Sequence, residues 1–338
     1  MSNKRILFTA PGLAEWVDCP MPEPAAGQVV VKLSRSSISP GTERANLIGD
    51  PNVSTIPGVV APFPRWGGYS STGHIVAVGE GVKSVKVGDR VSCSWSVHMK
   101  YCLLPESGVN IVPEGLDEAT AALVHIATFP MAALRKCGVE MGESVIVMGQ
   151  GVLGQMAVQL ARAAGAVPVI AVDPVPEKRA RALELGADVA LDPFAPDFAK
   201  TVKSLTGGGA NVAIEVTGLG SGLDMVLDCM ARFGRVALLG CTRSSDFTID
   251  YYRKVHAPGI TMIGAHTQAR PRQESHAGWW TERDDIKALF RLCTAGRLNL
   301  AALLEEIHSP LECTEVYTRL AAGGGFPVVQ FDWTTVED

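Results

Sequence analysis

Three closely spaced glycines have the pattern of a turn that binds phosphate groups. They stand as Gly149-x-Gly151-x-x-Gly154, with Val152 and Leu153 between the last two glycines. In such a turn the first glycine permits a tight bend, the second lets the backbone approach a pyrophosphate, and the third lets a helix pack against a strand. The amino terminus of that helix then faces the phosphates. The pattern therefore predicts a dinucleotide-binding site.

An acidic residue, Asp173, ends the next predicted strand and indicates which dinucleotide binds. A carboxylate at this position accepts hydrogen bonds from the ribose hydroxyls of NAD and repels the 2′-phosphate of NADP. Arg179 lies one helical turn into the next element and leaves NADP as an alternative. Thr217 and Gly240 close two later strands, where a ligand crevice opens, although each is equally consistent with an ordinary turn. We expect NAD as the cofactor.

The elements that position this turn follow one another in the middle of the chain. Strands are predicted at 144–149, 167–173, 188–192, 210–218, 234–240 and 260–265, and helices at 153–165 and 176–186. Strands that alternate with helices indicate βαβ units and a parallel sheet. The continuous apolar run "SVIVMG" suits a sheet that is covered on both faces. The fold class is therefore α/β.

The residues before position 122 have a different organisation. Short apolar runs are broken by Gly and Pro, and Val29, Val31 and Leu33 alternate as in a strand with one buried face. This pattern predicts a β barrel or sandwich. Mixed helix and strand return at the end of the chain, where "FPVVQFDW" could rejoin the first sheet. We therefore divide the chain into 1–122, a nucleotide-binding domain over 123–265, and a segment over 266–338 that completes the first domain.

Composition excludes several classes of protein. The 338 residues include 30 basic and 35 acidic side chains, a net charge of −5 without blocks of like charge, so neither nucleic acid nor a membrane surface is an expected partner. No apolar run is long enough to span a bilayer, and no secretory signal is expected. The eight cysteines form no CxxC motif and are interpreted as thiols in a reducing cytoplasm.

Four segments together resemble the medium-chain dehydrogenase/reductase superfamily, which includes zinc alcohol and polyol dehydrogenases and zinc-free quinone reductases. These segments are "VKLSRSSISPGTE", "GHIVAVGEGVKSVKVGDRV", "AALVHIATFPMAALRKCGV", and "GQGVLG" with Asp173. The resemblance spans nearly the whole chain. It implies a Rossmann doubly wound parallel sheet domain inserted in a GroES-like β-rich catalytic domain, an NAD(P)-dependent oxidoreductase acting on CH–OH donors, and a homodimer or homotetramer.

The positions that hold catalytic zinc in such dehydrogenases carry other residues here. By resemblance, a ligand cysteine matches Ser39 or Pro40, and a Gly-His-Glu triplet matches Gly68-Tyr69-Ser70. The remaining ligand position matches His125. Catalytic zinc needs three protein ligands with N, S or O donors, and only His125 qualifies. The closely spaced cysteines that hold structural zinc in the family are also missing, so we predict a protein without metal.

Without zinc, another group must take the proton when an alcohol is oxidised. The resemblance places Ser39 beside the substrate and matches Thr42 to a hydroxyl that relays protons. His125 has the chemistry of a general base, Tyr69 could donate to or accept from the substrate oxygen, and Glu43 could orient one of these groups. Structural interpretations compete with these catalytic roles. His125 and Tyr69 could be packed core residues, and Thr42 and Glu43 could cap a helix that begins "ERANLIG".

A second unusual segment, residues 264–285, combines tryptophans with arginines. Trp279 and Trp280 could form a platform for a sugar or another polar ring, or they could belong to a dimer surface. Three other histidines have no recognisable partners and are interpreted as structural: His74, His98 and His308.

These observations favour a zinc-independent, NAD-dependent dehydrogenase that oxidises a secondary alcohol of a small sugar, polyol or ring compound to a ketone, reversibly. The Gly-Thr-Glu and Gly-Tyr features are also similar to those of bacteriochlorophyllide dehydrogenases and some bacterial sugar dehydrogenases. An enone or quinone reductase is the first alternative, although such enzymes more often use NADPH, which Asp173 disfavours. The second alternative is a nucleotide-binding protein that has lost catalysis.

Overall fold

The computed structural model describes residues 3–54, 56 and 58–337, and the chain forms two compact units. Unit 1 comprises Met1–Ile126 and Asn299–Asp338, and unit 2 comprises Ala127–Leu298, so unit 2 is an insertion. Residues 266–298 thus belong to unit 2, whereas the sequence analysis assigned them to the returning segment. The reason lies in helix α7 (Glu282–Thr294), where the buried Asp285 accepts a hydrogen bond of 2.8 Å from Arg135 Nε of the same unit.

Unit 2 is built on a six-stranded sheet in which every neighbouring pair is parallel. Its strands are β10 (Val189–Leu191), β9 (Val169–Val172), β8 (Val145–Met148), β11 (Ala210–Glu215), β12 (Met230–Leu238) and β13 (Thr261–Gly264), in this spatial order. The six predicted strands are therefore confirmed. Strands β8 and β9 are buried along their whole length, as expected for a sheet covered on both faces.

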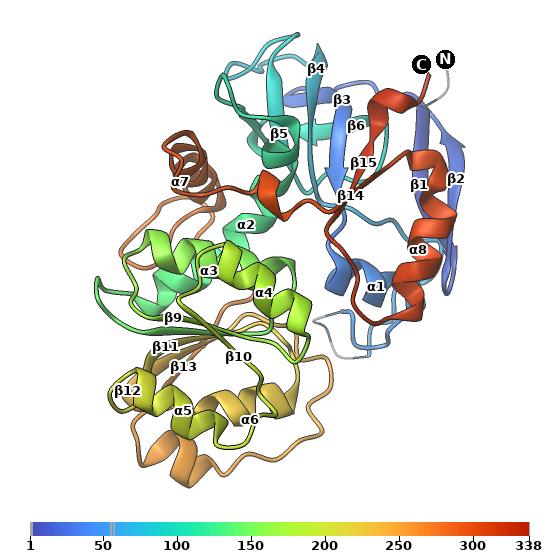
Figure 1. Ribbon diagram of the computed structural model, residues 1–338. Helices are drawn as coiled ribbons and strands as arrows, with labels where there is room; N and C mark the ends of the chain where they lie inside the picture. The colour runs from blue at the N-terminus through green and yellow to red at the C-terminus, as the bar shows by residue number, and fades with distance from the viewer. Residues whose placement is uncertain (1–2, 55, 57, 338) are drawn as a thin grey trace. The chain divides into compact units, whose positions relative to one another are not determined.

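Helices cover both faces of this sheet. Helices α3 (Val152–Ala163) and α4 (Pro176–Glu184) lie on one face, and α5 (Phe198–Leu205) and α6 (Gly220–Asp228) lie on the other (Figure 1). The strand order reverses between β8 and β11, so the sheet is doubly wound and its ligand crevice is expected at the carboxyl ends of these strands. A π-helical turn, η2 (Tyr252–His256), precedes β13. Helix α2 (Glu118–Cys137) begins in unit 1 and ends in unit 2.

Unit 1 contains two sheets. The seven-stranded sheet has the order β14 (Glu306–His308), β15 (Val329–Asp332), β3 (Gln28–Ser37), β4 (Ser70–Val78), β5 (Arg90–Ser94) and β7 (Val109–Ile111), with β6 (Tyr101–Pro105) also paired to β3. Because β15 pairs antiparallel with β3, the prediction that "FPVVQFDW" rejoins this sheet is confirmed. The predicted alternation in β3 is interrupted by a register shift between Val30 and Val31, and both are buried. A separate hairpin consists of β1 (Asn3–Ala10) and β2 (Leu13–Cys19).

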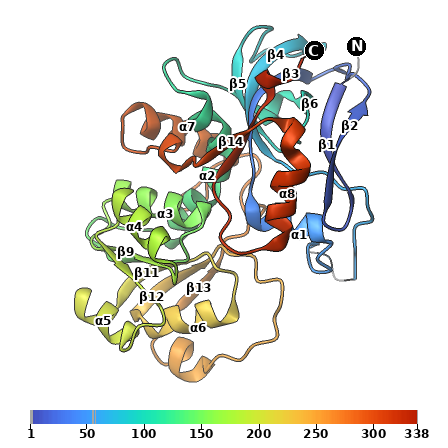
Figure 2. The ribbon, with the colours of Figure 1, turned by 45° about the vertical axis from the view of Figure 1, so that its right-hand side comes forward.

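Two helices pack beside the sheets of unit 1. Helix α8 (Cys313–Ala322) lies along the β1–β2 hairpin and contacts α1 (Pro40–Ile48) (Figure 2). The core of unit 1 includes Phe8 of β1, Tyr317 of α8 and Trp333 near the end of the chain, all fully or almost fully buried. Four short 3₁₀ segments complete the unit: η1 (Glu106–Gly108), η3 (Ala301–Leu303), η4 (Pro310–Glu312) and η5 (Trp333–Thr335). No helix in the described ranges combines the length and the apolar character that crossing a bilayer requires.

Candidate active site

The glycine-rich turn has the geometry that its sequence predicts. Gly149 follows β8 with φ of 99°, in the left-handed region that favours glycine. A Cβ atom on Gly154 would lie 1.9 Å from the carbonyl oxygen of Gly149, so only glycine lets α3 pack this closely. A Cβ on Gly151 would meet nothing within 4 Å. The turn therefore has open space at Gly151 and tight packing at Gly154.

Asp173 directly follows β9, and Arg179 lies in the first half of α4. The Asp173 carboxylate is 6% exposed and accepts hydrogen bonds from the main-chain nitrogens of Gln150 (2.8 Å) and Val175 (2.9 Å). Nη1 of Arg179 donates to the carbonyl oxygens of Asp173 (2.8 Å) and Pro174 (2.9 Å). The guanidinium is thus held against the main chain, beside the carboxylate that we expect to bind the ribose hydroxyls.

Thr217 and Gly240 lie where β11 and β12 end. The main-chain nitrogen of Thr217 donates to Glu215 Oε1 at 2.8 Å, and its hydroxyl contacts the same oxygen. Burial raises the pKa of Glu215, although the hydrogen bonds from Thr217 and Gly218 act to lower it. A Cβ on Gly240 would lie 2.3 Å from the nitrogen of Gly218, so close packing explains this glycine. Contact of Thr217 or Gly240 with a cofactor stays a prediction.

This end of the unit 2 sheet fits a dinucleotide. The first residues of α3, Val152 and Leu153, are half-buried, and main-chain N–H groups in a first helical turn have no partner within the helix. These donors and the helix dipole suit phosphate oxygens, and the open space at Gly151 suits their close approach.

A second group of predicted residues comes together in unit 1. The Tyr69 hydroxyl donates a hydrogen bond to Ser39 Oγ, and its ring meets the ring of His125 edge-on, with 5.8 Å between centroids. His125 lies in α2 and is fully buried. Residues from three distant segments therefore meet. Tyr69 and His125 stand at two positions that the sequence analysis matched to zinc ligands, and Ser39 is one of the two candidates, Ser39 or Pro40, for the third.

Trp95 completes this cluster, although no local sequence pattern marked it. Its ring centroid lies 4.9 Å from that of His125 and 6.0 Å from that of Tyr69. The residue has φ of 60° and is 47% exposed. A large, half-exposed aromatic side chain in a rarely adopted backbone conformation is more typical of a functional surface than of a core.

Thr42 and Glu43 lie inside a helix, not ahead of one. Helix α1 begins at Pro40 with Ser39 at its N-cap, so the expected start at "ERANLIG" is wrong. Proline at the first helical position explains the earlier start. Glu43 is buried, and its Oε1 accepts a hydrogen bond of 2.7 Å from the nitrogen of Ser39. Glu43 therefore holds the backbone of a residue that binds Tyr69, and Thr42 is half-buried in the first turn.

Two histidines interpreted as isolated have charged partners. His98 is fully buried, with Nε2 3.0 Å from Glu43 Oε2 and Nδ1 2.7 Å from the hydroxyl of Ser36. His308 Nε2 lies 2.8 Å from Glu306, and its Nδ1 contacts Glu312. The sequence missed the His98 contact because 55 residues separate it from Glu43.

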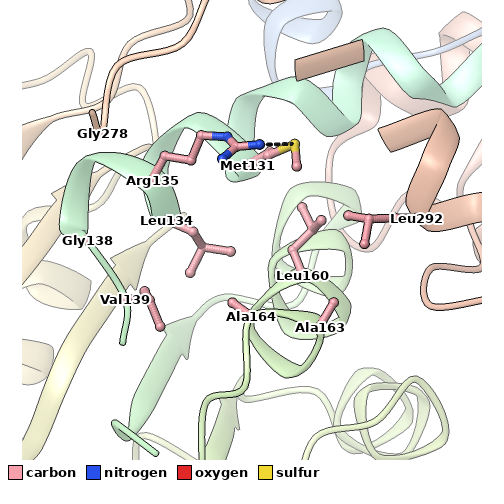
Figure 3. A pocket seen from close by; sticks show the side chains of 10 residues that line it. All are labelled: Met131, Leu134, Arg135, Gly138, Val139, Leu160, Ala163, Ala164, Gly278 and Leu292. Carbon is pink, nitrogen blue, oxygen red and sulfur yellow. Dashed lines mark hydrogen bonds between the residues drawn. The ribbon is translucent and has the colours of Figure 1, made fainter. Parts of the chain in front are cut away.

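Trp279 and Trp280 pack against the last turn of α2 in unit 2. The Arg135 guanidinium lies 3.6 Å from the centroid of the Trp280 ring, and Lys136 Nζ lies 4.8 Å from that of Trp279. The same arginine borders an apolar pocket of about 330 Å³ (Figure 3). None of the predicted site residues lines this pocket, whose walls are Met131, Leu134, Arg135, Gly138, Val139, Leu160, Ala163, Ala164, Gly278 and Leu292. A role of the tryptophans in substrate binding stays a prediction.

The residues at the zinc-matched positions do not fit catalytic zinc. Ser39 and Tyr69 offer neutral hydroxyls that already bind each other, and His125 is the only member with a usual zinc donor. Across the described ranges, no three His, Cys, Asp or Glu side chains are grouped as a metal site.

Comparisons with known proteins agree with this architecture. The family model for the alcohol dehydrogenase GroES-like domain matches residues 25–128, and that for zinc-binding dehydrogenases matches residues 152–279. A D-guloside 3-dehydrogenase of Shigella flexneri is 28% identical over 256 residues, covering 74% of this chain and 72% of that protein. An L-threonine 3-dehydrogenase of Pyrococcus horikoshii is 28% identical over 337 residues, covering 90% of this chain and 91% of that protein.

A solved structure gives the same fold. Benzyl alcohol dehydrogenase from Acinetobacter calcoaceticus superposes with a TM-score of 0.83 at 19% identity, covering 98% of this chain and 99% of that chain. The chain therefore belongs to the medium-chain dehydrogenase/reductase superfamily, as an alcohol-dehydrogenase-like oxidoreductase that acts on CH–OH groups.

Proposed function

We propose that this protein is a zinc-independent, NAD-dependent dehydrogenase that oxidises a secondary hydroxyl of a sugar, polyol or ring compound to a ketone, reversibly. The contact of Tyr69 with Ser39 and His125 carries this proposal, because side chains with proton-transfer chemistry meet at the positions that match zinc ligands. The relatives named guloside and threonine 3-dehydrogenases support a secondary hydroxyl as the reacting group.

NAD is the proposed cofactor, with NADP as the alternative. The Asp173 carboxylate favours ribose hydroxyls over a 2′-phosphate. Nη1 of Arg179 donates to two main-chain carbonyl oxygens and lies 3.4 Å from Asp192 Oδ2, so its charge already has an acidic partner. Gly151, Val152 and Leu153 would hold the pyrophosphate at the start of α3. When NAD is bound, its nicotinamide ring would accept the hydride that leaves the substrate carbon.

The hydroxyl proton of the substrate must leave together with the hydride. The Tyr69 hydroxyl donates a hydrogen bond to Ser39, and a phenol oxygen can also accept one from the substrate hydroxyl. His125, at the edge of the Tyr69 ring, supplies an imidazole, the side chain that most often serves as a general base. We assign Tyr69 to orient the substrate oxygen and His125 to act as general base, and Thr42 stays a candidate for the proton path.

The substrate is proposed to contain a ring. Trp95 lies beside Tyr69 and His125 and is 47% exposed. The C–H face of a sugar or other saturated ring packs well against an aromatic face of this size. Trp279 and Trp280 would serve a similar purpose only if their partners Arg135 and Lys136 move aside.

A substrate screen tests the function. The purified protein is incubated with NAD and a panel of glycosides, polyols, cyclic secondary alcohols and L-threonine, and reduction is followed by the nicotinamide absorbance. We expect turnover with a cyclic or sugar secondary alcohol. Turnover only with quinones or enones and reduced cofactor would establish the reductase alternative, and cofactor binding without any turnover would indicate lost catalysis.

We also propose a cytoplasmic protein that assembles as a homodimer or homotetramer. All eight cysteines are free thiols, as is usual in a reducing compartment. Strand β13 ends the order of the unit 2 sheet, and an edge strand offers main-chain groups to a second copy. Light scattering of the purified protein tests the assembly, and a monomer would contradict it.

A further inference from the structure

Four polar side chains from distant segments meet in the core of unit 1. Ser36, Glu43, His98 and Tyr317 come from β3, α1, the segment before β6, and α8, and each is at most 1% exposed. Burying a carboxylate and an imidazole costs stability unless their hydrogen bonds are satisfied.

The Glu43 carboxylate is satisfied by three donors. Oε1 accepts from the nitrogen of Ser39 at 2.7 Å. Oε2 accepts from the Tyr317 hydroxyl and lies 3.0 Å from Nε2 of His98. Tyr317 keeps its proton, because burial and then the neighbouring Glu43 charge raise its pKa. A carboxylate held in this way has a fixed position in the core.

The neighbours of His98 determine which of its nitrogens carries the proton. Nε1 of Trp333 donates to Ser36 Oγ at 2.8 Å, and an indole can only donate. The Ser36 hydroxyl proton is then available for Nδ1 of His98, 2.7 Å away. With Nδ1 as acceptor, the proton of neutral His98 lies on Nε2 and points at Glu43. Every group of the chain from Trp333 to Glu43 is then satisfied.

This buried chain ends at the candidate active site. Glu43 binds the nitrogen of Ser39, and Ser39 Oγ accepts the hydrogen bond of Tyr69. We infer that His98 is a positioning residue: as the Nε2–H tautomer it fixes the Glu43 carboxylate, which fixes Ser39 and thereby the Tyr69 hydroxyl. The consequence for catalysis rests on the proposed function of Tyr69. The His98 side chain acts on Tyr69 through Glu43 and Ser39, and its main-chain nitrogen also donates to the carbonyl oxygen of Gly67 at 3.1 Å.

Two substitutions at His98 separate its two hydrogen bonds. His98→Gln places an amide N–H near the position of Nε2 and keeps a donor for Glu43. His98→Asn is also polar and neutral, but it reaches only toward Ser36 and removes that donor. Thr72→Val is the control, because it deletes another buried hydrogen bond of unit 1, from the Thr72 hydroxyl to the Val91 carbonyl at 2.8 Å.

Nitrogen-15 NMR of labelled histidine tests the tautomer, and carbon-13 NMR of labelled tyrosine reports the Tyr69 hydroxyl. The chain has five tyrosines, so Tyr69→Phe identifies the signal. We expect the Nε2–H tautomer of His98 near neutral pH. We expect the Asn variant to shift the Tyr69 signal and to lower kcat about tenfold, with cofactor Kd within about twofold. The Gln variant and Thr72→Val should keep the Tyr69 signal and kcat, whatever their melting temperatures.

An Nδ1–H tautomer or an imidazolium would overturn the inference, even if neither variant folds. An Asn variant with the Tyr69 signal of the wild type would overturn it as well. Both measurements are made without substrate, so they decide the positioning even if no alcohol is oxidised. That last result would refute the proposed function alone.

Discussion

The Tyr69 hydroxyl donates a hydrogen bond to Ser39 Oγ, which joins the position matched to a ligand histidine to one of the two candidates, Ser39 or Pro40, for the ligand cysteine. Two ligands of one tetrahedral zinc ion lie about 3.3 Å apart, given bonds of about 2.0 Å. A direct hydrogen bond between hydroxyls is shorter, about 2.7 Å. A hydrogen-bonded pair of hydroxyls is therefore closer together than two ligands of one zinc ion, and His125 lies at the edge of the Tyr69 ring.

Two alanine substitutions in the glycine-rich turn should affect different properties of the protein, cofactor affinity in one case and stability in the other. Gly151→Ala adds a Cβ in open space at φ of −73°, so the protein should keep its melting temperature and lose cofactor affinity about tenfold or more. Gly154→Ala places a Cβ 1.9 Å from a carbonyl oxygen and should destabilise the protein by several kcal/mol, roughly as overpacking does. Thermal melts and cofactor titrations measure both. A Gly151→Ala variant with unchanged affinity would contradict the assigned phosphate site.

Asp173→Asn should weaken the preference for NAD. The amide keeps the size and one acceptor of the carboxylate, and it removes the charge that repels a 2′-phosphate. We expect the ratio of NADP to NAD dissociation constants to fall about tenfold, equivalent to ~1.4 kcal/mol. Titrations of the wild type and the variant with both cofactors give the ratio. Tighter NADP than NAD binding by the wild type would show that Arg179 or another cation dominates.

His125→Asn tests the proposed general base. The change keeps polarity and removes the group that takes the proton, so kcat should fall about a hundredfold while the Kd of NAD stays within about twofold. Single-turnover rates normalised to the cofactor-binding fraction exclude a loss of folded protein. If His125 is only a core residue, the melting temperature will fall and turnover per folded molecule will persist.

The stability of unit 1 should depend on pH through His308. Burial alone would lower its pKa, but hydrogen bonds with Glu306 and Glu312 outweigh it and raise the pKa above 6.5. The protonated form is therefore stabilised in the folded state. This contribution, about 1 kcal/mol or less for a partly exposed site, is complete below pH 6.5 and is lost as pH rises through the raised pKa.

Melting curves of the wild type and His308→Asn across this range provide the measurement. The difference between their melting temperatures should shrink as the pH rises. A difference that is constant or grows with pH would contradict the ion pairs of His308.

The nucleotide-binding unit could be predicted from sequence because its determinants are local. Gly149, Gly154 and Asp173 lie within one strand–turn–helix–strand segment, and the apolar run of β8 directly reflects burial on both faces. The start of α1 was harder to place. Pro40 and a buried glutamate together fix it, and the burial of Glu43 is set by His98 and Tyr317 from far along the chain.

The candidate site in unit 1 could be predicted only in part. Family resemblance identified Ser39, Tyr69 and His125, which the fold brings together. Trp95 and His98 escaped prediction because short polar segments such as "SCSWSVH" have no periodicity that reveals where each side chain points. The extent of the returning segment was also missed, because the Arg135–Asp285 ion pair that keeps α7 in unit 2 joins residues 150 positions apart.

The metal content of active protein tests the central claim most directly. Elemental analysis of the purified enzyme is combined with its turnover before and after exhaustive chelation. We predict far less than one zinc per chain and unchanged kcat after chelation, because the Ser39, Tyr69 and His125 side chains do not form a zinc donor set. About one zinc per chain, with turnover lost on chelation and restored by added zinc, would contradict the account.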